Sequence, residues 1–408
     1  MTDTMTKPVE SLSEYVDRAR AWLAALEPRF GAEARKGLSV EQDLALAREY
    51  QTLKSEAGYA CITLPREIGG GGGTELHKIL FTQEESKYDY PTVYFGVSLG
   101  MPVPMMLRYA DQETIQRLIP PSIRGELIWA QLFSEPAAGS DLAALRTRAV
   151  RDGDGWRIDG QKLWTSWAQF ADYAIGVFRT DPTVAKHAGL TFFWLDMKSP
   201  GITVKEVRKL AGKTSEINEV FFDNVYVPDS QRMGEVGAGF RVAIETLMIE
   251  RYSVTDENMG GPSLYDVAKF AANARINGRP ALDDGQVRHA LADALVERQG
   301  LRSIHRRALN AMAAGEEPGP EGSIRKLRLA RRRQIIAELS LDLLGAQGIA
   351  LDPEVSRAQD AAWSWIEIPG GRIAGGTDEI LRNTIAEKVL GLPQDYRPDK
   401  KVPFNQIG

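Results

Sequence analysis

The stretch DGDGWRIDGQKLWTS, residues 152–166, decides the fold. Its DGDG opening has the composition of a tight turn, and the WRIDGQKLWTS that follows has the composition of a strand, so the two together predict a β-hairpin. Similar runs surround it: YAIGVF, LTFFWLDM, ITVKEV and EVFFDNVYV are rich in the β-branched and aromatic residues that strands favour. We therefore expect residues 129–236 to form a separate β domain, of the size of a small barrel or sandwich.

The chain before this region has helical periodicity. Ser11 and Glu14 form an S-x-x-E capping box, and apolar residues follow at helical spacing. Further helices are expected over residues 41–57, with Gly58 as the stop, and over residues 74–87.

Helical periodicity returns after residue 236. A long helix is expected to open near Gly237, and others to cover about 284–312 and 323–349. The order α, β, α predicts an α+β protein with an N-terminal α-helical domain, a central small β-barrel or sandwich, and a C-terminal α-helical domain like a four-helix bundle. The expected boundaries of these domains are 1–128, 129–236 and 237–408.

Composition narrows the function. The 408 residues carry a formal net charge of −5, which argues against nucleic acid as a partner. No apolar run reaches membrane-spanning length, and the N-terminus is too polar for a signal peptide, so a cytoplasmic location is expected. Cys61 is the single cysteine, and the four histidines lack paired spacing, so neither a disulfide framework nor a metal site is expected. We expect Cys61 to be a small core residue.

Two further segments have local interpretations. The glycine run 69–73 lacks both a preceding strand and a lysine partner, so we expect a turn rather than a phosphate loop. The basic segment RKLRLARRR, residues 325–333, is expected to be a solvated helix face, with a phosphate or partner site as the alternative.

Three motifs carry a resemblance. LFSEPAAGSDLAALRT (132–147) packs hydroxyls, a proline and small residues into a loop where backbone N–H groups can approach a flavin edge or a pyrophosphate, although the segment alone also fits an ordinary turn. GQKLWTSWAQFADY follows at 160–173, and GGTDEILRNTIAEKVLG at 375–391. With these motifs in register, nearly the whole chain resembles the acyl-CoA dehydrogenase family.

The resemblance implies a flavoprotein oxidoreductase of lipid catabolism or β-oxidation, with FAD as cofactor. Such an enzyme desaturates an acyl-CoA to the 2-enoyl-CoA, passing the α-proton to a carboxylate and the β-hydride to flavin N5. The expected partners are the acyl-CoA substrate and an electron-transfer flavoprotein or similar acceptor. The family is oligomeric, so we expect a homodimer, a homotetramer, or a heteromer with a related subunit.

The flavin contacts are implied residue by residue. In the family's S/T-E-P-x-A-G-S-D loop, residues like Gln131, Phe133 and Ser134 lie along the isoalloxazine, with the Ser134 hydroxyl near N5. Ser140 resembles the serine shared between the flavin pyrophosphate and the acyl-CoA.

The second motif matches the family's W-x-T/S at Trp164 and Ser166, whose indole packs against the flavin and whose hydroxyl caps its polar edge. From its composition alone, Trp164 also fits a strand aromatic of the core.

A neighbouring protomer usually completes the flavin site. Arg275 and Gln286 keep the polar residues of that pattern, but Gly278 stands where the family has phenylalanine. Gly345, in the segment LGAQG, resembles the turn over the adenosine half, with Asp342 in place of the usual glutamine. Either an unusual homo-oligomer results, or a different subunit faces this one.

The third motif lacks a carboxylate. Many family members have a glutamate, the base that removes the α-proton, at the position of Gly375. Here Gly375 and Gly376 would contact the acyl-CoA, with the Gly375 N–H as a donor to the thioester oxygen. Thr377 is a candidate helix cap, and Thr377 and Glu379 match flavin-contacting positions, whereas Asp378 lies too far along to be the base.

Glu250 is the candidate replacement. Glu250 and Arg251, within LMIERYSV, match the base and following arginine of isovaleryl- and long-chain acyl-CoA dehydrogenases, in which the arginine faces the CoA. The alternative is a surface glutamate in a helical ion pair, but no cation stands three or four residues away. An unpaired glutamate in such an apolar stretch is costly, so we expect Glu250 to be catalytic.

Two other functions remain as alternatives: an oxidase or monooxygenase of the same fold that uses O₂, and a structural subunit of a heteromeric acyl-CoA dehydrogenase. The small residues at 374–376 indicate room for a branched, long or polycyclic acyl group, as in bacterial steroid side-chain degradation.

Overall fold

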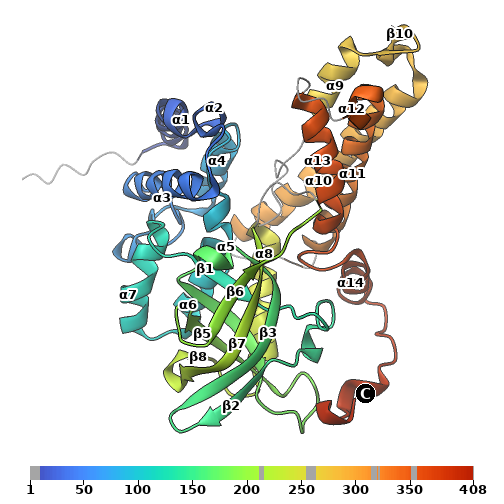
Figure 1. Ribbon diagram of the computed structural model, residues 1–408. Coiled ribbons are helices and arrows are strands. Elements are labelled where there is room, and N and C mark those ends of the chain that lie inside the picture. The colour runs from blue at the N-terminus through green and yellow to red at the C-terminus, as the bar shows by residue number, and fades with distance from the viewer. Residues whose placement is uncertain are drawn as a thin grey trace, which may run out of the picture.

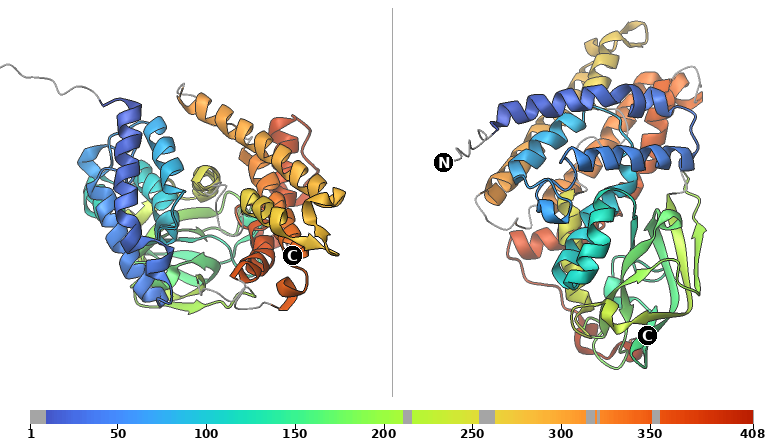
Figure 2. Two further views of the ribbon diagram at one scale, coloured as in Figure 1. Left: turned by 90° about the horizontal axis from the view of Figure 1, so that it is seen from above. Right: turned by 90° about the vertical axis from the view of Figure 1, so that its left-hand side faces the viewer.

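The computed structural model describes residues 10–210, 216–253, 263–313, 319, 322–350 and 356–407. Within these ranges, the side chains of residues 249–253, 309, 312–313, 349–350 and 356–360 are not described. The N-terminal and C-terminal helices stand side by side above a central sheet (Figures 1 and 2). The predicted α+β architecture of three domains is therefore confirmed, while the exact boundaries between the domains stay a prediction.

The N-terminal domain is built from short helices whose ends the sequence specifies locally. Ser11 and Glu14 form the expected capping box at the start of the first helix, and Thr74 caps the fourth. An aromatic cluster fills the space between them, with Tyr15, Tyr50 and Phe81 buried. The helices are α1 Leu12–Phe30, α2 Ala32–Arg35, α3 Val40–Glu56, α4 Glu75–Glu85, α5 Gly96–Gly100, α6 Pro102–Tyr109 and α7 Gln112–Ile123.

Cys61 lies in the turn between α3 and α4. It packs against the hydrophobic cluster that joins α6 and α7 to the sheet, and burial raises the pKa of its thiol to about 11. The glycine run 69–73 forms a turn, as expected, and a Cβ at Gly70 would lie 2.2 Å from the Leu64 carbonyl oxygen. Glycine is therefore needed at position 70 for the close packing of this turn against the Leu64 carbonyl.

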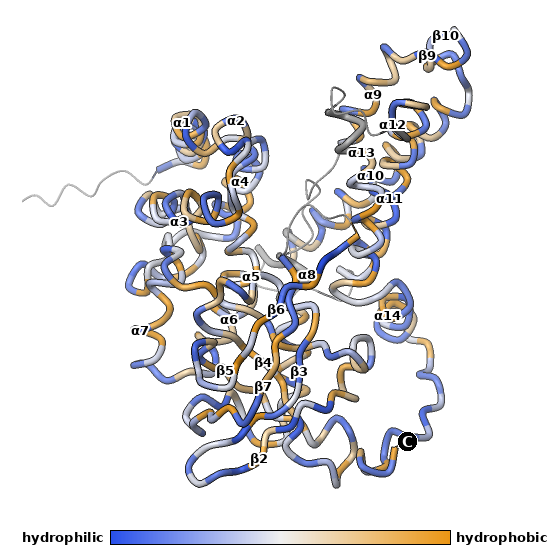
Figure 3. The backbone as a smooth tube through the Cα atoms, viewed as in Figure 1, coloured by the Kyte–Doolittle hydropathy of each residue, from blue (hydrophilic) through white to orange (hydrophobic). Residues whose placement is uncertain are grey.

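The central domain is one eight-stranded sheet with the order β6–β7–β3–β2–β4–β5–β8, to which β1 adds by parallel pairing with β4. Asp152 pairs with Gly155 across the β2–β3 turn, which confirms the hairpin predicted from DGDG. Hydrophobic residues run along the strands at the centre of the molecule (Figure 3). The strands are β1 Trp129–Leu132, β2 Arg148–Asp152, β3 Gly155–Ser166, β4 Tyr173–Arg179, β5 Leu190–Asp196, β6 Ile202–Glu206, β7 Ile217–Pro228 and β8 Arg232–Met233.

The C-terminal domain is helical. The single helix expected over 323–349 is broken at Gly345, which has a positive φ of 54°. Arg325 and Arg332 are buried, so the prediction of a solvated face for the basic segment is wrong for these two residues. The helices are α8 Gly239–Ser253, α9 Leu264–Asn273, α10 Gly285–Ala313, α11 Gly322–Leu344, α12 Ala346–Ala350, α13 Ser356–Gly371 and α14 Asp378–Thr384, and the short strands are β9 Arg275–Ile276 and β10 Arg279–Pro280.

The helix α8 connects the three domains. It packs against β4 and β5, against α5 and against α11, and in the view from above it lies between the two groups of helices (Figure 2). Beyond α14, the chain runs back down to the β domain (Figure 1). Among the helices of the described ranges, none is long and apolar enough to cross a membrane.

Candidate active site

The first two motifs meet at the edge of the sheet. The loop 133–147 leaves β1, and the Ser134 carbonyl accepts a hydrogen bond of 2.8 Å from the Leu163 N–H in β3. This bond places Ser134 next to the strand position that precedes Trp164. Residues from the two motifs, almost 30 positions apart along the chain, therefore form one site.

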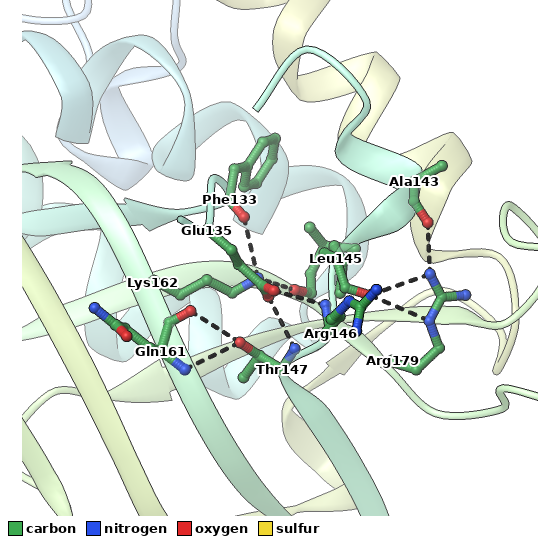
Figure 4. A network of polar contacts seen from close by, with 10 residues as sticks. Phe133, Glu135, Ala143, Leu145, Arg146, Thr147, Gln161, Lys162 and Arg179 are labelled. Atoms are coloured by element: carbon green, nitrogen blue, oxygen red, sulfur yellow. Dashed lines mark hydrogen bonds and ion pairs between the residues drawn. The ribbon is translucent and has the colours of Figure 1, made fainter. Parts of the chain in front are cut away.

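A buried ion pair holds this arrangement in place (Figure 4). The ammonium of Lys162, on β3, is fully buried and donates to Glu135 Oε1 at 2.9 Å, to the Phe133 carbonyl at 3.0 Å and to the Val177 carbonyl at 2.8 Å. The Glu135 carboxylate also accepts hydrogen bonds from the N–H groups of Arg146 and Thr147. Both ends of the loop are thus tied to one lysine and one glutamate.

The burial of this ion pair shifts the pKa values of both of its members. Burial lowers the pKa of Lys162 to about 8, although Glu135 opposes the shift. For Glu135, burial alone would raise the pKa, but Lys162, Thr147 and Arg146 together bring it below the ordinary value. The pair is therefore charged at neutral pH, and its lysine loses its proton in mildly alkaline solution.

Arg179, at the end of β4, fixes the second half of the loop. Its guanidinium donates to the Ala143 carbonyl at 2.5 Å and to the Leu145 carbonyl at 3.2 and 3.3 Å (Figure 4). Burial lowers the pKa of Arg179 to about 10.

Two of the predicted flavin contacts place groups inside the molecule. The Phe133 side chain is buried and packs edge-on against Phe192, with 5.6 Å between the ring centroids. Gln131 Nε2 is buried and has no hydrogen-bond partner in the described part of the chain. A buried amide donor without a protein acceptor needs an acceptor from outside the chain, which a ligand or a water can supply.

Trp164 lies at an irregularity of the β3–β7 ladder between Lys162 and Thr165. It has a positive φ of 63° and is 58% exposed. The interpretation of Trp164 as a core aromatic is therefore wrong. An exposed indole held by an unusual backbone conformation offers a flat apolar face to a planar ligand. Ser166 is half-buried two residues further, and Ser140 is exposed in the loop.

The α14 loop offers free backbone donors. Gly375 and Gly376 have φ values of 65° and 98°, and no described group accepts a hydrogen bond from either N–H. The Lys326 ammonium holds the Gly376 carbonyl at 2.6 Å. The Thr377 hydroxyl caps α14, as expected, by accepting a bond of 3.2 Å from the Ile380 N–H.

The carboxylates of α14 have partners. Buried Asp378 accepts a hydrogen bond of 2.8 Å from Arg372 Nε. Glu379 is exposed and lies 3.7 Å from Arg382 Nη1. Glu250 and Arg251 lie in the last part of α8, but their side chains fall outside the described residues.

The remaining predicted contacts lie elsewhere. Arg275 lies in β9 and Gln286 lies at the start of α10; the β9–β10 hairpin is at the far tip of the C-terminal domain, remote from the β domain (Figure 1). Gln286 lines a pocket of about 270 Å³ between α10 and α11. Gly345 lies at the junction of α11 and α12. Within one chain, these three residues do not join the site formed by Ser134 and Trp164.

Lys162 and Glu135 were not predicted from the sequence as site residues, although a signal was present. Trp156, Ile158 and Lys162 occupy alternate positions of β3, and all three side chains are buried. A lysine in the inward register of a strand requires a buried partner. No group of three or more potential metal ligands occurs in the described ranges.

The residues present fit a flavin. The Gln131 amide is a donor without an acceptor in the described chain, and the exposed Trp164 indole offers a flat face for stacking. The N–H groups of Gly375 and Gly376 are two further donors that no described group uses. Such a set suits a planar, acceptor-rich ring system.

Comparison with known proteins identifies the family. Family models for the N-terminal, middle and C-terminal domains of acyl-CoA dehydrogenase match residues 12–126, 130–225 and 237–390. The acyl-CoA dehydrogenase IpdE1 of Mycobacterium tuberculosis is 32% identical over 95% of this chain and 100% of its own length. The acyl-CoA dehydrogenase FadE34 of the same organism is 36% identical over 80% of this chain, but the match spans only 44% of that relative.

Solved structures agree. The ChsE4–ChsE5 complex from Mycobacterium tuberculosis matches with a TM-score of 0.77 and 25% identity, over 96% of this chain and 100% of the matched chain. A variant of the Tcur3481–Tcur3483 steroid ACAD matches with a TM-score of 0.77 and 25% identity, over 93% of this chain and 99% of the matched chain. The chain therefore belongs to the acyl-CoA dehydrogenase family, whose members are FAD-binding oxidoreductases that act on CH–CH bonds.

Proposed function

We propose that this chain desaturates an acyl-CoA to the 2-enoyl-CoA and that Glu250 is the base. The observation that carries this assignment is the pairing of Asp378, the carboxylate nearest to Gly375 along the chain, with Arg372. The Asp378 carboxylate is engaged with the Arg372 guanidinium and is therefore not free to face a substrate. Glu379 is exposed and lies beside Arg382, so neither acid replaces the missing carboxylate.

Removal of the α-proton needs two groups of this chain to act together. The Glu250 carboxylate takes the proton from the α-carbon of the thioester. The negative charge that develops on the thioester oxygen needs a fixed donor, and the free N–H of Gly375 fits this role. Lys326 orients the same turn by holding the Gly376 carbonyl.

The chain also provides the contacts that would hold the cofactor. We assign the flavin ring to the indole of Trp164, the amide of Gln131, the buried ring of Phe133 and the hydroxyls of Ser134 and Ser166. Ser140 would hold the pyrophosphate, and Thr377 and Glu379 the ring edge near α14. FAD, when bound there, supplies the acceptor for the hydride that leaves the β-carbon.

The substrate class is the finer part of this proposal. Gly375 and Gly376 leave side-chain volume open beside the thioester, which favours a bulky acyl group, branched, long or polycyclic. One solved relative is described as a steroid ACAD, which agrees with a polycyclic acyl chain. A panel of acyl-CoA esters, read as bleaching of the flavin, tests this. Activity that peaks sharply at short linear esters would contradict it.

The experiment for the base is the Glu250→Gln substitution. Anaerobic flavin reduction by a good acyl-CoA should slow by about 10²–10⁴-fold, the usual contribution of a positioned base. FAD content should be unchanged. Glu245→Gln is the matched control, because Glu245 lies on the same helix but accepts a hydrogen bond from Tyr109. Near-normal reduction in Glu250→Gln would refute the assignment.

The O₂-dependent alternative has a separate test. After reduction by substrate, the flavin of a dehydrogenase should persist in air until an electron-transfer flavoprotein is added. Reoxidation by air at the rate of turnover would instead identify an oxidase or monooxygenase.

A second candidate is a subunit role in a heteromer, and the β9–β10 hairpin favours it. Asn277 and Gly278 form its two-residue turn with φ values of 51° and 79°. This turn type needs positive φ at both positions, so the phenylalanine of the family pattern is disfavoured at Gly278. The matched structure of a ChsE4–ChsE5 complex contains two different subunits.

The ratio of flavin to protein separates the two assemblies. We expect the chain purified alone to hold well under one FAD per chain if a different subunit completes the site. Co-expression with a related subunit should then restore the ratio. One FAD per chain in the isolated protein would favour a homo-oligomer.

A further inference from the structure

The last described residues of the chain lie beyond the part that the family models match. The match to the C-terminal family model ends at Leu390, and residues 391–407 follow it. This segment, here called the strap, crosses exposed from α14 to the β domain, where it ends in two short 3₁₀ turns, Pro398–Lys401 and Phe404–Gln406 (Figure 1). It docks on the loop between β4 and β5: the N–H groups of Phe404 and Asn405 donate to the carbonyls of Val184 and Pro182.

The first link between the strap and the site is ionic. The ammonium of Lys186 lies 2.8 Å from Asp399 of the strap and 2.7 Å from Asp141. Asp141 is the last residue of the SEPAAGSD sequence, next to Ser140. Lys186 is only 12% exposed, whereas both aspartates are partly exposed. One half-enclosed cation therefore joins the strap to the loop that carries Ser140.

The second link is aromatic. The ring of Phe404 covers the guanidinium of Arg179, with 3.8 Å from its carbon to the ring centroid. The edge of the same guanidinium donates to the carbonyls of Ala143, Leu145 and Lys186. Phe404 thus completes the enclosure of the cation that fixes residues 143–145, and enclosure strengthens its hydrogen bonds by excluding water.

We propose that the strap is a positioning element, which fixes residues 141–145 from outside through Asp399 and Phe404. It acts through Lys186 and Arg179 rather than by touching a ligand. The consequence for acyl-CoA and FAD binding rests on the proposed function, whereas the effect on the loop itself does not.

The test is amide hydrogen exchange in the intact chain. The N–H groups of Ala144 and Leu145 bond to carbonyls within the loop, those of Asp141 and Leu142. In Phe404→Ala, their exchange should be about tenfold faster, as expected for the loss of an enclosed cation–π contact. Tyr396→Ala, in the same strap but 89% exposed, should leave exchange unchanged. Phe404→Tyr, which keeps a ring over Arg179, should restore slow exchange.

Two neighbouring amides provide an internal reference. The N–H groups of Arg146 and Thr147 donate to the Glu135 carboxylate, which the strap does not contact, so their exchange should not change. Unchanged exchange at Ala144 and Leu145 in Phe404→Ala would overturn the inference. Equal acceleration at all four amides would also overturn it, because the ring would then support the domain as a whole.

The ionic link has its own pair of variants. Asp399→Asn should speed the exchange of Ala144 and Leu145 by about threefold, a smaller effect because the link is partly exposed. Asp395→Asn, a matched change in the same strap, should have no effect on this exchange.

In turnover, Phe404→Ala should raise KM for acyl-CoA more than it lowers kcat. A chain without acyl-CoA activity would refute the proposed function, while the exchange experiment would still decide the role of the strap.

Discussion

Lys162 shows how one residue can control a loop that it does not belong to. Its ammonium needs three N–H groups to serve Phe133, Glu135 and Val177, and a neutral amine has only two. Loss of the proton therefore removes one of the bonds that hold the loop 133–147, in addition to leaving Glu135 charged without a counter-ion. The buried lysine is a rigid support only while it is protonated.

Stability should depend on this proton. The pKa of Lys162 is about 8 in the folded chain and 10.5 in its ordinary state, so between these values the unfolded chain binds a proton that the folded chain does not. The contribution of Lys162 to the free energy of unfolding should therefore rise with pH across this window, by up to about 3 kcal/mol. Urea denaturation at pH 7 to 10.5, compared with Lys162→Met, measures it.

The control is Lys205→Met, which removes an exposed lysine from β6, two strands away from β3 in the same sheet. The difference in unfolding free energy between the wild type and this control should be independent of pH up to about 9. A difference between the wild type and Lys162→Met that stays flat from pH 8 to 10.5 would contradict the prediction.

The β9–β10 hairpin illustrates how an element can depart from a family pattern for a local reason. Gly278 is at the second turn position with φ of 79°, and the space around it is open. The Arg275 guanidinium donates to the Gly278 carbonyl at 2.8 Å and so supports the turn. The absence of the family's phenylalanine is therefore coupled to the shape of the hairpin, while Arg275 is engaged in its own turn.

Gly278→Phe should destabilise the C-terminal domain. The reason is backbone strain of about 1–2 kcal/mol at a positive φ, since a Cβ at this position has open space around it. Hydrogen exchange of α9 and α10 measures the effect. Gly300→Ala, a substitution with open space inside the helix α10, should instead be neutral or stabilising. A stable Gly278→Phe variant that also binds more FAD would show that the residue and not the turn limits the flavin site.

Local elements were predictable from the sequence, because their determinants lie within a few residues. The caps at Ser11 and Thr377 and the DGDG hairpin are of this kind, and all three are confirmed. The motif at 132–147 was also recognisable as a loop. The buried support of this loop was not predictable, since Lys162 of β3 reaches Val177 of β4 only because both strands pair with β2, which joins segments distant in the sequence.

Other features of the site could not be predicted from local sequence patterns. The pairing of Arg372 with Asp378 depends on the path of the turn after α13. Phe404 and Arg179 are 225 positions apart in the sequence, and no periodicity in the strap predicts their contact. The role of Glu250 as the base stays a prediction, because its side chain lies outside the described residues.

At the scale of the whole molecule, polar links join the domains. Lys209, after β6, bonds Glu216 and lies 2.7 Å from Glu367 of α13, which connects the β domain to the C-terminal domain. On the other side, the Tyr109 hydroxyl donates to Glu245 of α8. These links help to fix the angle between the domains around the site.

Lys209→Met should loosen the first of these connections. We expect a loss of about 1 kcal/mol, because the lysine is 15% exposed and one cation serves two carboxylates. The thermal midpoint should fall by about 2 °C at low salt, and by less at high salt, where the ion pairs are screened. Lys198→Met, in an exposed turn of the same domain, is the control. Equal shifts in the two variants would contradict a role in joining the domains.

The setting of Cys61 makes the chain a reporter of its own opening. Because the thiol is unique, half-buried and has a pKa raised to about 11, a disulfide reagent at neutral pH should modify it slowly in the closed molecule and faster in molecules in which the contact between the N-terminal helices and the sheet has transiently separated. The labelling rate then gives the frequency of that separation without any flavin signal. Labelling rates measured with and without an acyl-CoA would show whether ligand binding lowers the frequency of this separation.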